Sequence, residues 1–274
     1  MSVNEQTPTI SFPSVDSGEI EVRFPDAEDT VGQDQEWCEI RESGDDWRRV
    51  RFHDYSDVYN VPGLYEALFY RTLRCNSPQV IANMLNDVLT DHNEPTEKLR
   101  VLDVGAGNGM VGEQLFSAGV AEAVGIDIIP EARDAAVRDR PYVYRDYYVA
   151  DLTDLEESDE KKLRSHHLNA MTTVAALGFG DIPPAAFVKA LDLVDTPAWL
   201  AFNIKEDFLY DGGDNDFSAL IEYLRANKII RIEAFRRYQH RLATSGEPLY
   251  YVAVVAQKLA EVPDDCHGRF EQSD

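Results

Sequence analysis

Cysteine and long apolar runs are scarce in this sequence, and each shortage excludes a class of protein. The three cysteines, at positions 38, 75 and 266, are far apart and form no C-x-x-C pair. This spacing disfavours a disulfide framework or a zinc site and fits a reducing compartment. No apolar run approaches the roughly 20 residues of a membrane-spanning helix, which excludes an integral membrane protein. The first residues also lack the basic and apolar regions of a secretory signal, so we expect a cytoplasmic protein.

Positive charge is scarce as well. The 274 residues include 50 acidic and 26 basic side chains, and the net charge is −24. Such a surface repels nucleic acids and anionic lipid over most of its area, so we expect neither as a partner. Basic residues cluster only briefly, within residues 48–51 and 236–241. The one close histidine pair, His166 and His167, lacks a suitably spaced third ligand, so no metal site is expected.

The first third of the chain differs from the rest. Residues 1–46 hold 13 acidic side chains and two arginines. This composition predicts a weakly structured arm, with a substrate lid as the alternative. Two runs within it, residues 20–24 and 37–40, alternate in polarity and could form strands. Residues 47–98 show helical apolar spacing at 62–70 and 77–89, and we expect them to form a helical cap.

Residues 99–260 alternate between apolar runs and amphipathic segments, and residues 261–274 would form a tail. Alternation of this kind predicts an α/β domain with a parallel sheet covered by helices on both faces. No helix fits between the last two apolar runs, so these should form an antiparallel hairpin. We therefore predict a Rossmann-like, doubly wound, seven-stranded sheet that is mostly parallel. Its expected strands are 99–104, 123–127, 147–150, 170–177, 198–204, 229–237 and 249–258, with helices at 183–193 and 217–227.

The strongest local signal is the run VLDVGAGNGMVG at residues 101–112. An apolar strand runs into glycines and then into a helix, whose first N–H groups can bind a polar or anionic ligand. The run matches both the dinucleotide fingerprint G-x-G-x-x-G and the loop D-x-G-x-G-x-G of S-adenosylmethionine enzymes. Asp103 favours the second template, because a carboxylate there could hold an ammonium group and would repel a pyrophosphate. The predicted hairpin also favours it.

With these features, residues 99–258 resemble a class I S-adenosylmethionine-dependent methyltransferase. The glycine run is similar to the family's first motif, GIDIIP at 125–130 to its second, and ADLTD at 150–154 to its third. The hairpin matches the family's reversed seventh strand. This resemblance implies that S-adenosylmethionine is the cofactor. It implies that Asp127 accepts both ribose hydroxyls, and that Asp151 and Leu152 lie beside the adenine.

The expected cofactor-binding residues follow from this resemblance. The segment HDYSDVY at residues 53–59 is similar to a tyrosine-containing segment that closes over the methionine end of the cofactor in small-molecule methyltransferases. Tyr55 and Tyr59 in it are one helical turn apart, so both could point inward or pack in a core. The full expected set is Tyr55, Tyr59, Asp103, Gly105, Ala106, Gly107, Asn108, Asp127, Ile128, Asp151, Leu152 and Leu177.

Methyl transfer requires alignment of the acceptor and, where necessary, removal of its proton, so few residues are diagnostic. His53, Tyr238 and His240 are weak candidates for a general base, and a surface position for His53 and packing for the other two are the favoured explanations. The fourth strand lacks the Asn or Asp, Pro-Pro and aromatic ending that base-methylating enzymes carry. We predict transfer to an oxygen or nitrogen of a small-molecule acceptor. The alternatives are a protein methyltransferase, a non-catalytic binding module, a nicotinamide-dependent oxidoreductase and an aminopropyl transferase.

Overall fold

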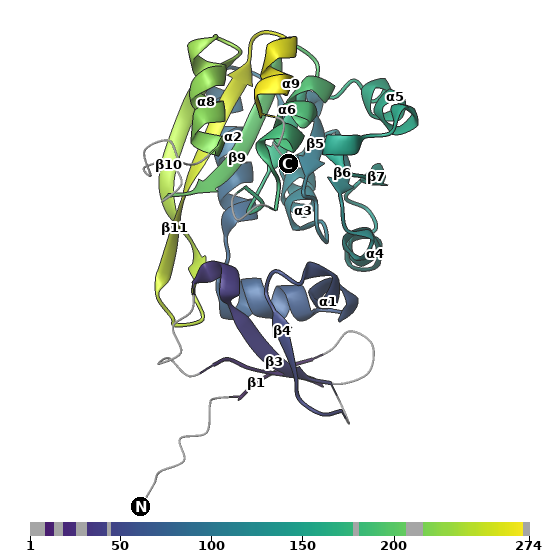
Figure 1. Cartoon of the computed structure of the whole chain (residues 1–274), viewed down its shortest axis with the longest axis vertical. Helices are drawn as coiled ribbons and strands as arrows, with labels where there is room; N and C mark the ends of the chain where they lie inside the picture. The colour runs from purple at the N-terminus through teal and green to yellow at the C-terminus, as the bar shows by residue number, and fades with distance from the viewer. Residues whose placement is uncertain are drawn as a thin grey trace, which may run out of the picture. The chain divides into compact units, whose positions relative to one another are not determined.

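The computed structural model describes residues 9–13, 19–25, 32–42, 45–177, 181–206 and 216–270. The chain divides into two compact units (Figure 1). The first comprises Met1–Asn76 and Gln239–Leu249, and the second comprises Ser77–Tyr238 and Tyr250–Asp274. These bounds differ from the expected ones at residues 46 and 98. Part of the expected arm shares a core with the first part of the expected cap, whereas the helix that begins at Ser77 belongs to a core of the second unit.

The second unit is built on a seven-stranded sheet with the order β10-β11-β9-β8-β5-β6-β7. The five strands from β9 to β7 in this order pair in parallel, and β11 pairs antiparallel with β9. This arrangement confirms the predicted Rossmann-like sheet with one reversed strand. The strands are β5 (Arg100–Val104), β6 (Glu122–Asp127), β7 (Asp146–Val149), β8 (Ala170–Thr173), β9 (Ala198–Lys205), β10 (Ile230–Leu242) and β11 (Pro248–Lys258).

Helices cover both faces of this sheet, because each strand of its centre is apolar on both sides. One core joins the sheet to α5, α6, α8 and α9, and a second core on other strand residues joins it to α2 and α3. Helix α9 and its buried Cys266 lie within the expected C-terminal tail. The helices of this unit are α2 (Ser77–Asp91), η3 (Thr96–Lys98), α3 (Met110–Ser117), α4 (Pro130–Asp139), η4 (Leu152–Asp154), α5 (Glu157–Ser165), α6 (Pro184–Leu193), α8 (Asp216–Ala226) and α9 (Asp264–Phe270).

Strand β8, the fourth of this sheet in chain order, is shorter than predicted. It ends at Thr173 instead of residue 177, because Ala175 adopts a left-handed backbone conformation with φ +59°. Its N–H donates to the side-chain oxygen of Asn203 on β9, at 2.6 Å. The chain therefore leaves the sheet early at this point and enters a loop at its carboxyl edge.

The first unit contains an antiparallel sheet with the order β1-β2-β3-β4. This differs from the weakly structured arm that the composition predicts for residues 1–46. The two alternating runs form β2 and β3, and their alternate residues Ile20, Val22, Cys38 and Ile40 are buried. The elements are β1 (Thr9–Pro13), β2 (Glu19–Arg23), η1 (Gln33–Gln35), β3 (Trp37–Arg41), β4 (Arg48–Arg51), α1 (Tyr55–Asn60) and the π-helix η2 (Glu66–Thr72).

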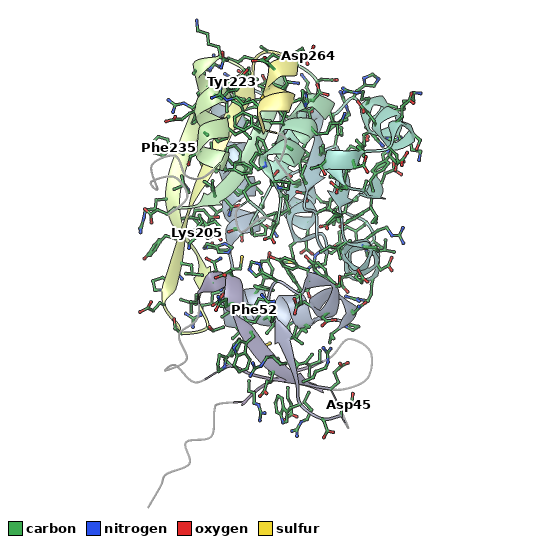
Figure 2. The ribbon with its side chains drawn as sticks, in the orientation of Figure 1. Asp45, Phe52, Lys205, Tyr223, Phe235 and Asp264 are labelled. Carbon is green, nitrogen blue, oxygen red and sulfur yellow. The ribbon has the colours of Figure 1, made fainter. Side chains whose placement is uncertain are left out.

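A buried ion pair closes the first unit. Glu36 is 1% exposed and forms an ion pair with Arg241, which is also buried. The two residues are 205 positions apart in the sequence. The same carboxylate accepts the N–H of Thr244 at 2.6 Å. Residues from the end of β10 thereby belong to the first unit, whose core includes Phe52, which Figure 2 labels.

Two features are absent from the described residues. None of their helices combines the length and apolarity that crossing a membrane requires. They also contain no group of three His, Cys, Asp or Glu side chains that could hold a metal ion.

Candidate functional site

The glycine run forms a tight loop between β5 and α3, as the sequence predicts. Gly105, Gly107 and Gly109 have φ values of +69°, +52° and +87°, and residues with a side chain rarely adopt such positive values. The loop is also crowded, since a Cβ on Gly105 would lie 3.0 Å from the Cβ of Ala176. The loop after β8 therefore packs directly on the glycine loop, and both lie where the parallel strands end.

Asp127 joins the end of β6 to the glycine loop. Its carboxylate accepts the N–H of Gly107 at 2.9 Å and the N–H of Ile129 at 3.0 Å. Burial raises the pKa of Asp127, and these backbone hydrogen bonds oppose that rise. A carboxylate has about four lone-pair positions, so it can accept further hydrogen bonds from a ligand. The neighbouring Ile128 is 58% exposed and presents an apolar surface beside the carboxylate.

Asp103 lies deeper than the sequence suggests. It is fully buried, and its two oxygens accept hydrogen bonds from the hydroxyls of Thr172 at 2.7 Å and Tyr144 at 2.5 Å. Burial raises its pKa to about 7, although both hydrogen bonds act in the opposite direction. This placement differs from the expected carboxylate at the mouth of the strand. The geometry instead makes Asp103 a support for the residues around the glycine loop.

Two tyrosines and an arginine that the sequence analysis did not select also support this loop. The hydroxyl of Tyr147 donates to the carbonyl of Gly107 at 2.8 Å. The guanidinium of Arg140 donates to the carbonyl of Asn108 at 3.2 Å and contacts Glu113 at 3.1 Å. Burial raises the pKa of both Tyr144 and Tyr147, so their hydroxyls remain protonated donors. The available signal was the dense group of tyrosines at residues 142–148.

The third expected segment follows β7. Val149 of β7 is in register with Asp127 of β6, so Asp127 and Asp151 lie at the ends of neighbouring strands. Asp151 is exposed and accepts hydrogen bonds from the N–H of Thr153 at 2.8 Å and from its hydroxyl at 2.7 Å. Asp151 therefore caps the short helix η4. The expected residues Ala106, Asn108, Leu152 and Leu177 are each buried in this unit.

A polar network that the sequence analysis missed supports the loop after β8. Asn203 is fully buried, and its amide nitrogen donates to the hydroxyl of Tyr238 at 2.6 Å and of Ser77 at 3.2 Å. The two hydroxyls are 2.6 Å apart. Because the amide oxygen binds the N–H of Ala175, the network fixes the backbone of this loop. Tyr238, a weak base candidate, thus has a structural role.

The other expected residues belong to the first unit and are described within it. The rings of Tyr55 and Tyr59 stack at 6.1 Å, and His53 lies 5.7 Å from Tyr55. Tyr59 is buried and continues the cluster to Tyr65 at 5.1 Å. His240 is also buried, and desolvation together with the charge of Arg241 holds its pKa well below the usual value. A neutral imidazole of this kind lies 3.8 Å from the sulfur of Cys75.

Comparisons with known proteins find similarity in structure. No family model matches the chain. No curated protein sequence matches it either. A methyltransferase from Anabaena variabilis aligns at 12% identity with a TM-score of 0.48, covering 76% of this chain and 96% of that one. Magnesium protoporphyrin IX methyltransferase from Synechocystis PCC 6803, with bound S-adenosylmethionine, aligns at 18% identity with a TM-score of 0.44, covering 66% and 79%.

A third structure, a ribosomal protein L11 methylase from Lactobacillus delbrueckii, aligns at 14% identity with a TM-score of 0.44, covering 67% of this chain and 79% of that one. Features of the chain itself define its fold. These are the strand order, the reversed β11 and the glycine loop that follows β5 at the centre of the sheet. The chain has the fold of the class I S-adenosylmethionine-dependent methyltransferases.

Proposed function

We propose that this chain is an S-adenosylmethionine-dependent methyltransferase that acts in the cytoplasm on an oxygen or nitrogen of a small molecule. One observation carries the proposal. The Asp127 carboxylate lies at a strand end, bonded to the glycine loop, and keeps lone pairs for a ligand. In open α/β sheets, ligands bind at this edge of the strands. A carboxylate beside a glycine loop suits the vicinal hydroxyls of a ribose.

The remaining residues would have the following roles. Backbone N–H groups at the start of α3 would bind the polar end of the cofactor, as helix N-termini do. Asp151 would accept from the adenine amine, and Leu152 would contact the ring. S-adenosylmethionine supplies an activated methyl group when bound, so the protein need only orient the acceptor and hold the cofactor. Asp103, with Tyr144, would keep the glycine loop in its binding geometry.

A small-molecule acceptor is favoured by charge and by the loop after β8. The net charge of −24 opposes nucleic-acid binding, and residues 175–184 lack the ending of base-methylating enzymes. A protein acceptor is the second candidate, because a structure with this fold, the L11 methylase, carries that description. A binding module without catalysis is the third. Retention of Asp127 and the glycine loop favours a working cofactor site over it.

The proposal is tested by titration calorimetry with S-adenosylhomocysteine and with NAD as a control ligand. We expect S-adenosylhomocysteine alone to bind. Asp127→Ala should weaken the binding of S-adenosylhomocysteine by 10- to 100-fold, which corresponds to about 1–3 kcal/mol for a lost charge-assisted pair. Asp134→Ala, which removes an exposed carboxylate from α4, is the matched control and should bind like the wild type. Equal affinities in both variants, with the fold intact, would contradict the assigned site.

The acceptor class is tested with methyl-labelled S-adenosylmethionine and a cell extract separated by size. Label in the low-mass fraction supports a small-molecule acceptor. Label that protease releases from the high-mass fraction would identify a protein acceptor, and label that nuclease releases would identify a nucleic acid. Cofactor binding without transfer to any fraction would favour the binding module.

A further inference from the structure

A short basic stretch stands out on this acidic chain. Residues 225–237 contain Arg225, Lys228, Arg231, Arg236 and Arg237, against a single carboxylate on Glu233. The rest of the sequence carries the large negative excess. The stretch runs from the last turn of α8 along β10, so its charges are placed on one edge of the second unit.

Two of these five cations are paired with other side chains. Arg231 binds Glu233 and Gln257, and Arg237 binds Glu206 and stacks over the ring of Tyr250 at 3.7 Å. The other three are exposed and form no ion pair within the described residues; they are Arg225, Lys228 and Arg236. Each is available to bind an external carboxylate.

A groove of about 700 Å³ lies beside these cations. Its lining contains four apolar side chains, three cations and one carboxylate; they are Ala226, Ile230, Ile232, Leu259, Arg225, Lys228, Arg231 and Glu222. Leu259 remains 40% exposed at this position. The groove therefore offers apolar contact and positive charge to the same ligand.

The strand beside the groove also has an open edge. β10 is the last strand of the seven-stranded sheet, and no described strand pairs with its outer side. An edge of this kind presents unpaired N–H and C=O groups to an added strand. Phe235 on the same strand is 75% exposed (Figure 2). Main-chain pairing, apolar contact and charge are thus available along one line.

We propose that this surface binds an extended, acidic polypeptide segment as an added strand next to β10. The β10 edge surface is defined by Arg225, Lys228, Arg231, Phe235 and Arg236. An extended segment rises about 3.3 Å per residue, so roughly ten residues suffice to pass from the groove to Arg236. Alternate carboxylates on such a segment would reach the cations, and the apolar residues between them would cover the groove and Phe235.

The charge of the surface argues against two other occupants. Pairing of two copies through β10 would place one basic stretch against another, which costs free energy because like charges repel. A long nucleic acid would extend beyond the stretch onto the acidic remainder of the chain, where phosphates are repelled. A short acidic polypeptide avoids both penalties, since its charge is opposite to that of this edge and it is too short to extend beyond it.

The test uses fluorescence anisotropy with a labelled ten-residue peptide of alternating Glu and Val. We expect saturable binding that weakens at least tenfold when KCl rises from 0.1 to 0.5 M, because the contact is electrostatic. A peptide with Lys in place of Glu should not bind. Methylating alternate backbone nitrogens of the Glu peptide removes the donors of one edge and should abolish binding. Binding of the Lys peptide, or undiminished binding of the methylated one, would overturn the proposal.

Two matched variants localise the contact. Combined Lys228→Gln and Arg236→Gln should weaken peptide binding about tenfold, whereas combined Lys161→Gln and Lys162→Gln on α5 should not. The control lysines are exposed, and each pairs with a neighbouring carboxylate. Equal weakening by both variants would contradict the assigned surface. Displacement of the peptide by a short RNA, or dimerisation that Arg236→Gln disrupts, would reassign it. S-adenosylhomocysteine affinity, measured in parallel, should not change, so the proposed function is tested separately.

Discussion

At the scale of single residues, Asp103 has the most informative environment. A carboxylate that is fully buried and has a pKa of about 7 favours the protonated form in the folded protein. Thr172 and Tyr144 both donate to it, so the ionised form still has partners when the pH rises. The residue therefore connects the stability of the site to pH in the physiological range.

The Asp103→Asn variant should reveal this connection. The folded pKa of about 7 exceeds the ordinary value of 3.8, so between these pH values the unfolded state loses the proton first. Asp103 consequently destabilises the wild type progressively as the pH rises from about 4 to 7, by at most ~4 kcal/mol from 1.36 kcal/mol per pKa unit. Urea unfolding at pH 5, 6, 7 and 8 should show that the free energy of unfolding of the variant increases relative to that of the wild type as the pH rises. A constant difference would contradict the buried, raised-pKa assignment.

The residues of the candidate site differ in how far the sequence predicts them. Gly105, Gly107 and Asp127 are predictable, because a strand, a glycine turn and a carboxylate at a fixed spacing imply one local geometry. Tyr144 and Asn203 are not, since their roles depend on contacts with residues 41 and 28 positions away. The group of tyrosines at residues 142–148 marks the region of Tyr144 but not its partner, and no local pattern marks Asn203.

At the scale of elements, α3 is constrained by one close approach. A Cβ on Gly112 would lie 2.8 Å from the ring of Tyr144, which donates to Asp103. Gly112→Ala should therefore displace that ring and cost ~1–3 kcal/mol, as overpacking does. Gly268 in α9 is the matched helical glycine, and a Cβ added there would meet no atom within 4 Å. Gly268→Ala should instead stabilise by up to ~1 kcal/mol, because alanine favours the helix.

These two variants are compared by chemical denaturation and by S-adenosylhomocysteine affinity. Only Gly112→Ala should lower the affinity, since only that substitution disturbs the support of the glycine loop. Similar stability changes in both variants would contradict the packing of Tyr144 on α3.

The loop after β8 depends on Asn203 in the same way. Asn203→Ala removes the acceptor of the Ala175 N–H and leaves a part-buried donor unpaired, at a cost of ~1–3 kcal/mol. Ser77→Ala removes one hydroxyl of the network and leaves the Ala175 bond in place, so its effect should be smaller. Denaturation midpoints of the two variants test this order. The reverse order would show that the network does not hold the loop through Asn203.

Most elements follow from periodicity, and the exceptions have physical reasons. The central strands are apolar on both sides, so their runs are visible in the sequence, as at residues 198–205. The described N-terminal strands bury alternate residues and are surrounded in the sequence by acidic residues, so composition averaged over residues 1–46 conceals them. The fourth strand ends early for a reason that lies in a different strand, the side chain of Asn203.

At the scale of the whole molecule, the dominant property is the net charge of −24. Self-repulsion of this size destabilises the compact state more than the expanded one, and salt screens it. The buried pair between Glu36 and Arg241 is shielded from the solvent and should respond little. Stability should therefore increase with ionic strength, whereas peptide binding at the β10 edge surface should decrease.

Added KCl should therefore change the stability and the peptide affinity in opposite directions. Between 0.1 and 1 M KCl, the Tm measured by calorimetry should rise by several degrees, since ~1 kcal/mol corresponds to about 2–4 °C for a chain of this size. Sorbitol at equal osmolality is the control, because it alters solvation without screening charge. If KCl and sorbitol raise the Tm equally, self-repulsion is not the cause. If KCl lowers the Tm, exposed ion pairs such as Arg164 with Asp192 outweigh the repulsion, and the charge argument fails for the whole molecule.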